Sequence, residues 1–144
     1  MPAEGTAMRI TRVADWILYS TSHFDEQVAY LHDVLGMGIE RQGPAVVDHH
    51  FQRYALFAQP GGVTLELVES SPEFADFQNV TIVCFTVDDL DTALGELAAR
   101  KQAPISPVIT DGSGWGWTYL RMPDGAIYQL QGSVAEQSGR AIRP

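Results

Sequence analysis

The chain has 144 residues, of which 45% are hydrophobic and 19% charged, and 18 acidic against 9 basic residues give a formal net charge of −9. This length suits one globular domain with a substantial core, and the acidic balance argues against nucleic acid, whose phosphates need a basic surface. No apolar run approaches the ~20 residues that span a bilayer, and residues 1–8 lack a secretion signal. The single cysteine, Cys84, lies in an apolar run and predicts a buried structural thiol. We therefore expect a cytoplasmic protein without membrane or nucleic-acid partners.

The first half of the chain predicts a strand, a helix and three further strands. β-branched and aromatic residues indicate a strand over 10–20, and Ser22 is a capping candidate for the helix that follows. Gly36 is a natural end for this helix. Its apolar residues at helical spacing are Phe24, Val28, Leu31 and Leu35. The later elements are strands over 38–41, 51–58 and 63–68, a polar loop over 42–50 and a turn over 60–62.

The second half predicts the same order of elements. A strand over 80–87 leads to a helix that Asp88 or Asp89 caps. The strand predicted over 104–109 contains two prolines and is therefore expected at a sheet edge. The apolar face of this second helix comprises Leu90, Ala93, Leu94 and Leu97. The last elements are strands over 115–122 and 126–131, the turn Pro123-Asp124-Gly125, and a tail from residue 133 that we expect to fray.

The two halves repeat one structural unit. Residues 60–68 and 123–131 each read as a tight turn followed by an alternating strand, and Glu66 and Gln129 occupy the same place in them. A chain built from two copies of a module usually places its site between them, so the repeat predicts a cleft between the modules. The predicted organisation is a first module over 8–69, a linker over 70–78, a second module over 79–132, and flexible ends over 1–7 and 133–144.

Three short motifs occur in order within this doubled βαβββ pattern: Asp33-Val-Leu-Gly36, Val87-Asp-Asp-Leu90 and Met122-Pro-Asp-Gly125. Together they resemble the vicinal oxygen chelate superfamily, which includes glyoxalase I, extradiol dioxygenases and bleomycin-resistance proteins. The resemblance covers residues 8–132. It implies an α+β fold in which two βαβββ modules form a curled mixed sheet around a cleft, and it implies a homodimer.

The resemblance also implies four metal-ligand positions, which fall here on Trp16, Glu66, Ile82 and Gln129. Trp16 and Ile82 cannot ligate a metal, and a catalytic divalent metal usually takes three or more protein ligands. Rescue by Asp15 would need a bulge or a one-residue slip, because neighbouring strand residues point to opposite faces. We therefore expect no cofactor, and a divalent metal, if bound, would rest weakly on Glu66 and Gln129.

An aromatic stripe marks the strand over 115–122. Trp115, Trp117 and Tyr119 alternate with smaller residues, so all three rings share one face. Pairing across the last turn would set Tyr119 opposite Gln129 and Trp117 opposite Gln131. The rings either line the cleft, where they suit a planar ligand, or pack a core or a dimer interface.

Three further residues are candidates for the site. Trp16 would form part of the pocket wall, at the position where relatives carry a histidine. Glu66 lies in a half-buried strand, where desolvation would raise its pKa and suit it as a general base or as a counter-charge; the alternative is a solvent-facing acid. His50, at a strand entrance, either reaches the mouth of the cleft or lies at the surface.

The leading functional hypothesis is a glyoxalase/bleomycin-resistance-like protein that binds a small aromatic or cationic molecule in the inter-module cleft without a tightly bound metal. Its ligand-binding residues would be Trp16, His50, Glu66, Trp115, Trp117, Tyr119 and Gln129. The alternative is a lyase, isomerase or dioxygenase of the same superfamily, which depends on a metal or uses Glu66 as general base. A subunit that only mediates association is a third hypothesis.

Overall fold

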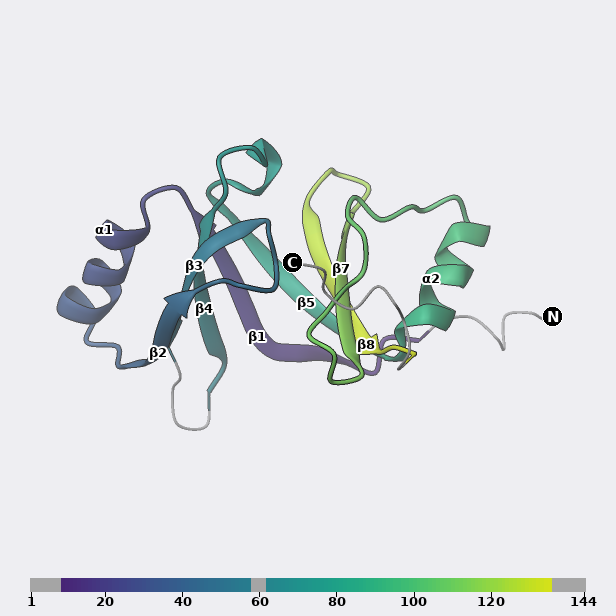
Figure 1. Ribbon diagram of the computed structural model, residues 1–144, viewed down its shortest axis with the longest axis horizontal. Coiled ribbons are helices and arrows are strands. Elements are labelled where there is room, and N and C mark those ends of the chain that lie inside the picture. The colour runs from purple at the N-terminus through teal and green to yellow at the C-terminus, as the bar shows by residue number, and fades with distance from the viewer. Residues whose placement is uncertain (1–8, 58–61, 136–144) are drawn as a thin grey trace. The chain divides into compact units, whose positions relative to one another are not determined.

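The computed structural model describes residues 9–57 and 62–135, and these form two compact units. One unit is Asp15–Val83, and the other consists of described residues 9–14 and 84–135. The elements follow the order βαβββ twice, so the predicted α+β fold of two repeated modules is confirmed (Figure 1). Within the described part of the chain, no helix is long and apolar enough to cross a membrane.

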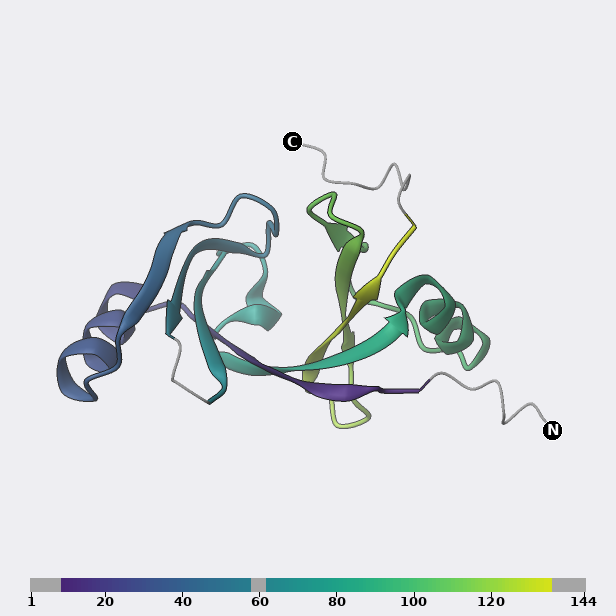
Figure 2. The same ribbon diagram turned by 90° about the horizontal axis from the view of Figure 1, so that it is seen from below.

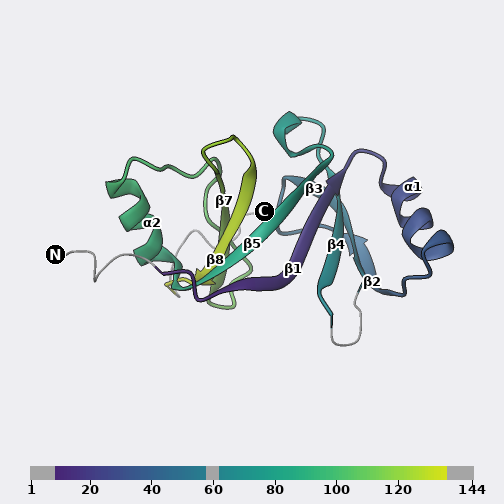
Figure 3. The ribbon, with the colours of Figure 1, turned by 180° about the vertical axis from the view of Figure 1, so that it is seen from behind.

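The strands of the first module are arranged in the order β2-β3-β4-β1. β1 pairs with β4 in parallel, whereas β3 is antiparallel to both β2 and β4, so this part of the sheet is mixed. Figure 3 shows β1 and β4 side by side. The bounds are β1 Arg12–Thr21, α1 Phe24–Ala29, β2 Ile39–Pro44, β3 Phe51–Phe57 and β4 Thr64–Ser70.

Helix α1 covers one face of these strands (Figure 2). Its core contacts come from Phe24, with Val28 and Leu31 packed beside it, against Ala55 and Phe57 of β3 and Leu65 and Leu67 of β4. Because side chains alternate along a strand, Glu66 between the two leucines takes the opposite face of β4. The burial of the two leucines therefore determines where the Glu66 carboxylate lies.

The end of the first helix differs from the prediction. A π-helical turn, Tyr30–Val34, follows α1, and the Leu35 N–H donates to the Tyr30 carbonyl at 3.1 Å. A π turn takes one more residue than an α turn, so Leu35 leaves the apolar face on which α-helical spacing placed it and is 56% exposed. Gly36 ends the segment in the left-handed region, with φ of +73°, as expected.

The predicted capping role of Ser22 is wrong. The residue before the helix is His23, and no side chain caps that end. Ser22 instead hydrogen-bonds to Asn79 at the start of β5 (Val80–Asp89), because its backbone N–H donates to the Asn79 Oδ1 at 3.1 Å. The competing partner lies 57 residues away in the sequence, which local reasoning about caps does not consider.

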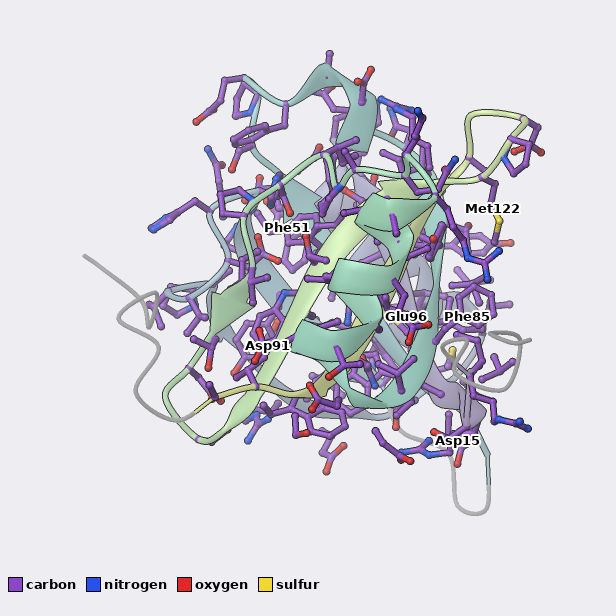
Figure 4. The ribbon with its side chains drawn as sticks, turned by 90° about the vertical axis from the view of Figure 1, so that its right-hand side faces the viewer. Asp15, Phe51, Phe85, Asp91, Glu96 and Met122 are labelled. Carbon is purple, nitrogen blue, oxygen red and sulfur yellow. The ribbon has the colours of Figure 1, made fainter. Side chains whose placement is uncertain are left out.

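The strands of the second module follow the order β5-β8-β7-β6. The sequence offered two N-cap residues for α2, and the structure shows that Asp89 is the cap. Its Oδ1 accepts a 3.1 Å hydrogen bond from the Thr92 N–H. The buried face of α2 packs against Val87, Leu120 and Leu130, and Figure 4 shows Asp91 and Glu96 on this helix. The bounds of the remaining elements are α2 Leu90–Ala99, β6 Ile109–Thr110, β7 Trp115–Arg121 and β8 Ile127–Ser133.

Several predicted boundaries are corrected. The strand predicted over 104–109 shortens to Ile109–Thr110, because prolines within that segment cannot donate to a ladder. β2 extends into the predicted 42–50 loop, and order in the predicted tail continues past β8 to residue 135. The predicted turn over 60–62 and most of the predicted flexible ends lie outside the described residues. The predicted module and linker boundaries stay predictions.

Candidate functional site

Trp16 and Glu66 meet on the face of the first module opposite α1. The parallel register pairs Trp16 with Thr64 and Leu18 with Glu66, which places Trp16 and Glu66 on one face of neighbouring strands. The indole Nε1–H of Trp16 donates to the Oε1 of Glu66 at 2.8 Å. Trp16 is 37% exposed, so it offers solvent an aromatic surface beside the carboxylate.

Burial raises the pKa of the Glu66 carboxyl above its ordinary value, because desolvation disfavours the charged form. The hydrogen bond from Trp16 opposes this shift in pKa, the negative charge of Asp48 reinforces it, and the positive charge of Arg41 opposes it. Among the described residues none donates to Oε2, so one oxygen of this half-buried carboxylate stays available to a ligand.

Asp48 is a site residue that the sequence analysis missed. Its Oδ1 lies 2.8 Å from the Nδ1 of His50 and also accepts the His50 backbone N–H at 3.1 Å. A carboxylate only accepts, so Nδ1 is the donor in this contact and carries a proton. Both side chains are buried, with 8% and 7% of each residue exposed, so His50 is not at the surface.

Two phenylalanines fix the His50 ring. Phe77 stacks on it with centroids 4.3 Å apart, and Phe74 lies 4.5 Å away in a tilted contact. These rings come from the segment around the 3₁₀ turn Ala75–Phe77, which the sequence analysis assigned to a linker. The Asp-x-His spacing of residues 48–50 was the available signal, but a loop position alone gave no reason to expect burial.

The other predicted site residues lie in the second unit. The predicted register is confirmed, because Tyr119 pairs with Gln129 and Trp117 with Gln131 across β7 and β8. Tyr119 is completely buried, whereas Trp115 is 39% exposed. Gln129 is buried and its amide Nε2 donates to the Gln131 Oε1 at 2.8 Å, which leaves its own carbonyl oxygen as an acceptor. Whether these residues bind a ligand stays a prediction.

The four positions that the resemblance assigns to metal ligands do not form a fitting donor set. Trp16 presents an N–H donor, Ile82 is a buried hydrocarbon side chain, and Glu66 already accepts from Trp16. Asp15 does not replace them, because the side chain of Trp16 takes the face that carries Glu66 and the neighbouring Asp15 therefore takes the other face of β1. Across residues 9–57 and 62–135, no group of three or more His, Cys, Asp or Glu side chains is arranged to hold a metal ion.

Comparison with protein families identifies one matching model. The model described as the Glyoxalase/Bleomycin resistance protein/Dioxygenase superfamily matches residues 13–130, which is most of the chain. No curated protein sequence matches at a significant level.

Solved structures share the fold at low sequence identity. Methylmalonyl-CoA epimerase from Mycobacterium tuberculosis is 20% identical, with a TM-score of 0.63 over 96% of this chain and 97% of that one. A variant of the Streptomyces coelicolor methylmalonyl-CoA epimerase, in complex with 2-nitronate-propionyl-CoA, is 19% identical, with a TM-score of 0.62 over 88% of this chain and 100% of that one. A glyoxalase/bleomycin resistance protein/dioxygenase superfamily member from Vibrio splendidus 12B01 is 16% identical, with a TM-score of 0.59 over 85% and 98%. At these identities the likeness shows a common fold.

Proposed function

Because the chain belongs to the Glyoxalase/Bleomycin resistance protein/Dioxygenase superfamily, we propose that it binds a small planar organic cation at Trp16 and Glu66 without a tightly bound metal. The observation that carries this proposal is the 2.8 Å hydrogen bond from the Trp16 indole to the Glu66 carboxylate. The bond brings an aromatic ring and an anion side by side, at two of the positions that the resemblance assigns to metal ligands.

The two groups are complementary to such a ligand. A cation over an indole face gains from the ring quadrupole, and a carboxylate in a partly desolvated site attracts a positive charge more strongly than one in water. Asp48 adds negative charge near Glu66, and the formal net charge of −9 favours approach of cations. Since a bound cation stabilises the charged carboxylate, affinity rises with pH through the titration of Glu66.

The test compares two ligands of the same shape. Calorimetry at mildly alkaline pH should show that 10-methylacridinium binds more tightly than uncharged acridine. Glu66→Gln, which keeps the size of the side chain and removes its charge, should weaken binding of the cation about tenfold. The control Glu40→Gln removes an exposed charge from β2 and should change affinity little. Equal affinities for both ligands, or an unaffected Glu66→Gln variant, would overturn the proposal.

The metal-free part of the proposal has its own measurement. Elemental analysis of protein purified without chelator should find no stoichiometric divalent metal. A stoichiometric metal that is lost in Glu66→Ala would show that this carboxylate is a ligand and would overturn that part of the proposal.

The raised pKa of Glu66 favours a second candidate function, which is proton abstraction beside a carbonyl group. Epimerisation beside a carbonyl needs a base that removes the C–H proton, and solved methylmalonyl-CoA epimerases share this fold. Incubation with methylmalonyl-CoA in D₂O should then give deuterium at the carbon that bears the methyl group, and Glu66→Gln should abolish the exchange. Absence of exchange in the wild type excludes this candidate for that substrate.

The association of two copies and the cytoplasmic location also stay proposals. The resemblance implied a homodimer, and light scattering coupled to gel filtration measures the mass in solution. A mass near 15.8 kDa, that of one chain, would contradict the dimer.

A further inference from the structure

A pocket lies within the unit Asp15–Val83, between α1 and the strands β2 and β3. Its volume is about 540 Å³, which falls within the range typical of small-molecule sites. Figure 1 shows α1 and β2 as neighbours in this unit. Trp16 and Glu66 do not line this pocket.

Part of the pocket lining is apolar, and we call this part its floor. Phe24 and Val28 contribute from α1 and Ile39 contributes from β2. Gly43 leaves room at the β2 wall, because the ring of Tyr54 is 3.8 Å from the place where a Cβ would lie. The floor therefore suits a short aliphatic or aryl group.

Arg53 is the single arginine among the described lining residues, and ion pairs already neutralise its positive charge. Arg53 Nε and Nη2 donate to the two oxygens of Glu69 at 2.7 and 3.1 Å, and Nη1 and Nη2 donate to the two oxygens of Asp25 at 3.1 and 3.3 Å. These hydrogen bonds, the one from Glu69 first, raise the pKa of Arg53. One guanidinium between two carboxylates leaves a local charge of minus one, so an anion is disfavoured here.

The π turn supplies acceptors to the same pocket. It carries His32 and Asp33, and both line the pocket. The Nδ1 of His32 lies 2.9 Å from the Met37 carbonyl oxygen, which can only accept, so Nδ1 donates and Nε2 of the neutral ring is the nitrogen that can accept. No described residue donates to the exposed carboxylate of Asp33. π-helical turns are frequent at functional sites.

We propose that this pocket is a second binding site, which takes a primary ammonium compound with a short apolar or aryl body. The ammonium group donates to the carboxylate of Asp33 and to Nε2 of His32, and the apolar body lies on the floor that Phe24, Val28 and Ile39 form. The site is independent of the proposed function at Trp16 and Glu66, because it uses other residues on other elements.

The experiment uses 2-phenylethylammonium as probe, with 2-phenylethanol and 3-phenylpropionate as its uncharged and anionic counterparts. Amide chemical shifts of the full chain are followed by NMR during titration. We expect saturable shifts at Ala29, Gln42 and Gly43 with the ammonium compound alone, and none at the Trp16 indole N–H. Shifts confined to that indole, or equal binding of the three compounds, would overturn the proposal.

Two variants test separately the charge of Asp33 and the open volume of the pocket. Asp33→Asn removes an exposed carboxylate and should weaken binding of the ammonium compound by about threefold to fivefold, with a weaker salt dependence of the affinity. Ala29→Phe, at an exposed helix position of the lining, should fill the pocket and abolish the shifts at Gln42 and Gly43. Asp15→Asn on β1 is the matched control and should bind as the wild type does. Full affinity in both pocket variants, with the thermal midpoint unchanged, would refute the assignment.

Discussion

The indole Nε1–H of Trp16 and the Oε1 of Glu66 are joined by a 2.8 Å hydrogen bond between two parallel strands. The contact bridges 50 residues of sequence. A histidine at position 16 would present a lone pair to a metal ion, whereas tryptophan presents a donor to the carboxylate. The residue type at position 16 therefore decides whether the side chain can ligate a metal or instead donates a hydrogen bond to Glu66.

Trp16→Phe should raise the pKa of Glu66 further. The indole hydrogen bond stabilises the charged carboxylate and lowers its pKa against the larger effect of burial, so its loss removes that stabilisation. NMR titration of the Glu66 side-chain carboxyl carbon measures the change. Tyr30→Phe, which removes an exposed hydroxyl from the π turn, serves as control. An unchanged or lower pKa in Trp16→Phe would contradict the role of the hydrogen bond.

Asp48→Asn should shift the same pKa in the opposite direction. The negative charge of Asp48 raises the pKa of Glu66, so a neutral amide at position 48 lets Glu66 ionise at lower pH. The same carbon resonance reports the shift. Glu40→Gln controls for the general loss of one negative charge. A shift upward, in the same direction as that of Trp16→Phe, would mean that Asp48 acts on Glu66 through packing and not through its charge.

Glu66→Gln should gain stability relative to the wild type as pH rises. The pKa of Glu66 is raised above its ordinary value of 4.5 in the folded state, so the native protein binds more protons than the unfolded chain between those two values. The stabilising contribution of Glu66 is thus complete below the unfolded value and is lost as pH rises through the folded value. Urea unfolding of both proteins at acidic and neutral pH measures the difference. A difference that is independent of pH would show that the pKa of Glu66 is not raised.

Asp89→Ala should destabilise the protein by about 1 kcal/mol, and Asp88→Ala should change its stability little. The Asp89 carboxylate accepts the Thr92 N–H at the start of α2, which satisfies one backbone donor that the helix leaves without a partner. The two aspartates are neighbours in sequence, so they form a matched pair for thermal or urea unfolding. Equal losses of stability in the two variants would show that the hydrogen bond from the Thr92 N–H to Asp89 is not the cause of the destabilisation.

Gly132→Ala and Gly95→Ala should have opposite effects on stability. A Cβ at Gly132 would lie 2.5 Å from the Val87 carbonyl oxygen, and since the neighbour is backbone, a strand must move to accept it. Gly95 lies in α2 with no atom near the added Cβ, so alanine there should stabilise by about 0.5–1 kcal/mol. Thermal unfolding compares the two variants. Stability retained in Gly132→Ala would mean that β8 is not held closely to Val87.

Features that depend on near neighbours along the chain could be predicted from the amino-acid pattern. Alternation along β7 and β8 and the turn over 123–125 were enough to predict that Tyr119 pairs with Gln129. Helical spacing likewise placed Leu90 and Leu97 of α2 in the core. These predictions succeeded because turn geometry and side-chain periodicity are set within a few residues.

Contacts between groups far apart in the chain were not predictable from the sequence, because they depend on how the strands pair and pack. The contact between Trp16 and Glu66 requires the parallel register of β1 and β4, and the burial of His50 beside Asp48 requires aromatic rings from a segment about 25 residues further along the chain. The exposure of Leu35 follows from a π turn that apolar spacing does not reveal. Such contacts depend on the packing energy of many residues together, which a pattern of neighbouring residues in the sequence does not reveal. The candidate site is therefore a property of the fold, although each of its residues is visible in the sequence.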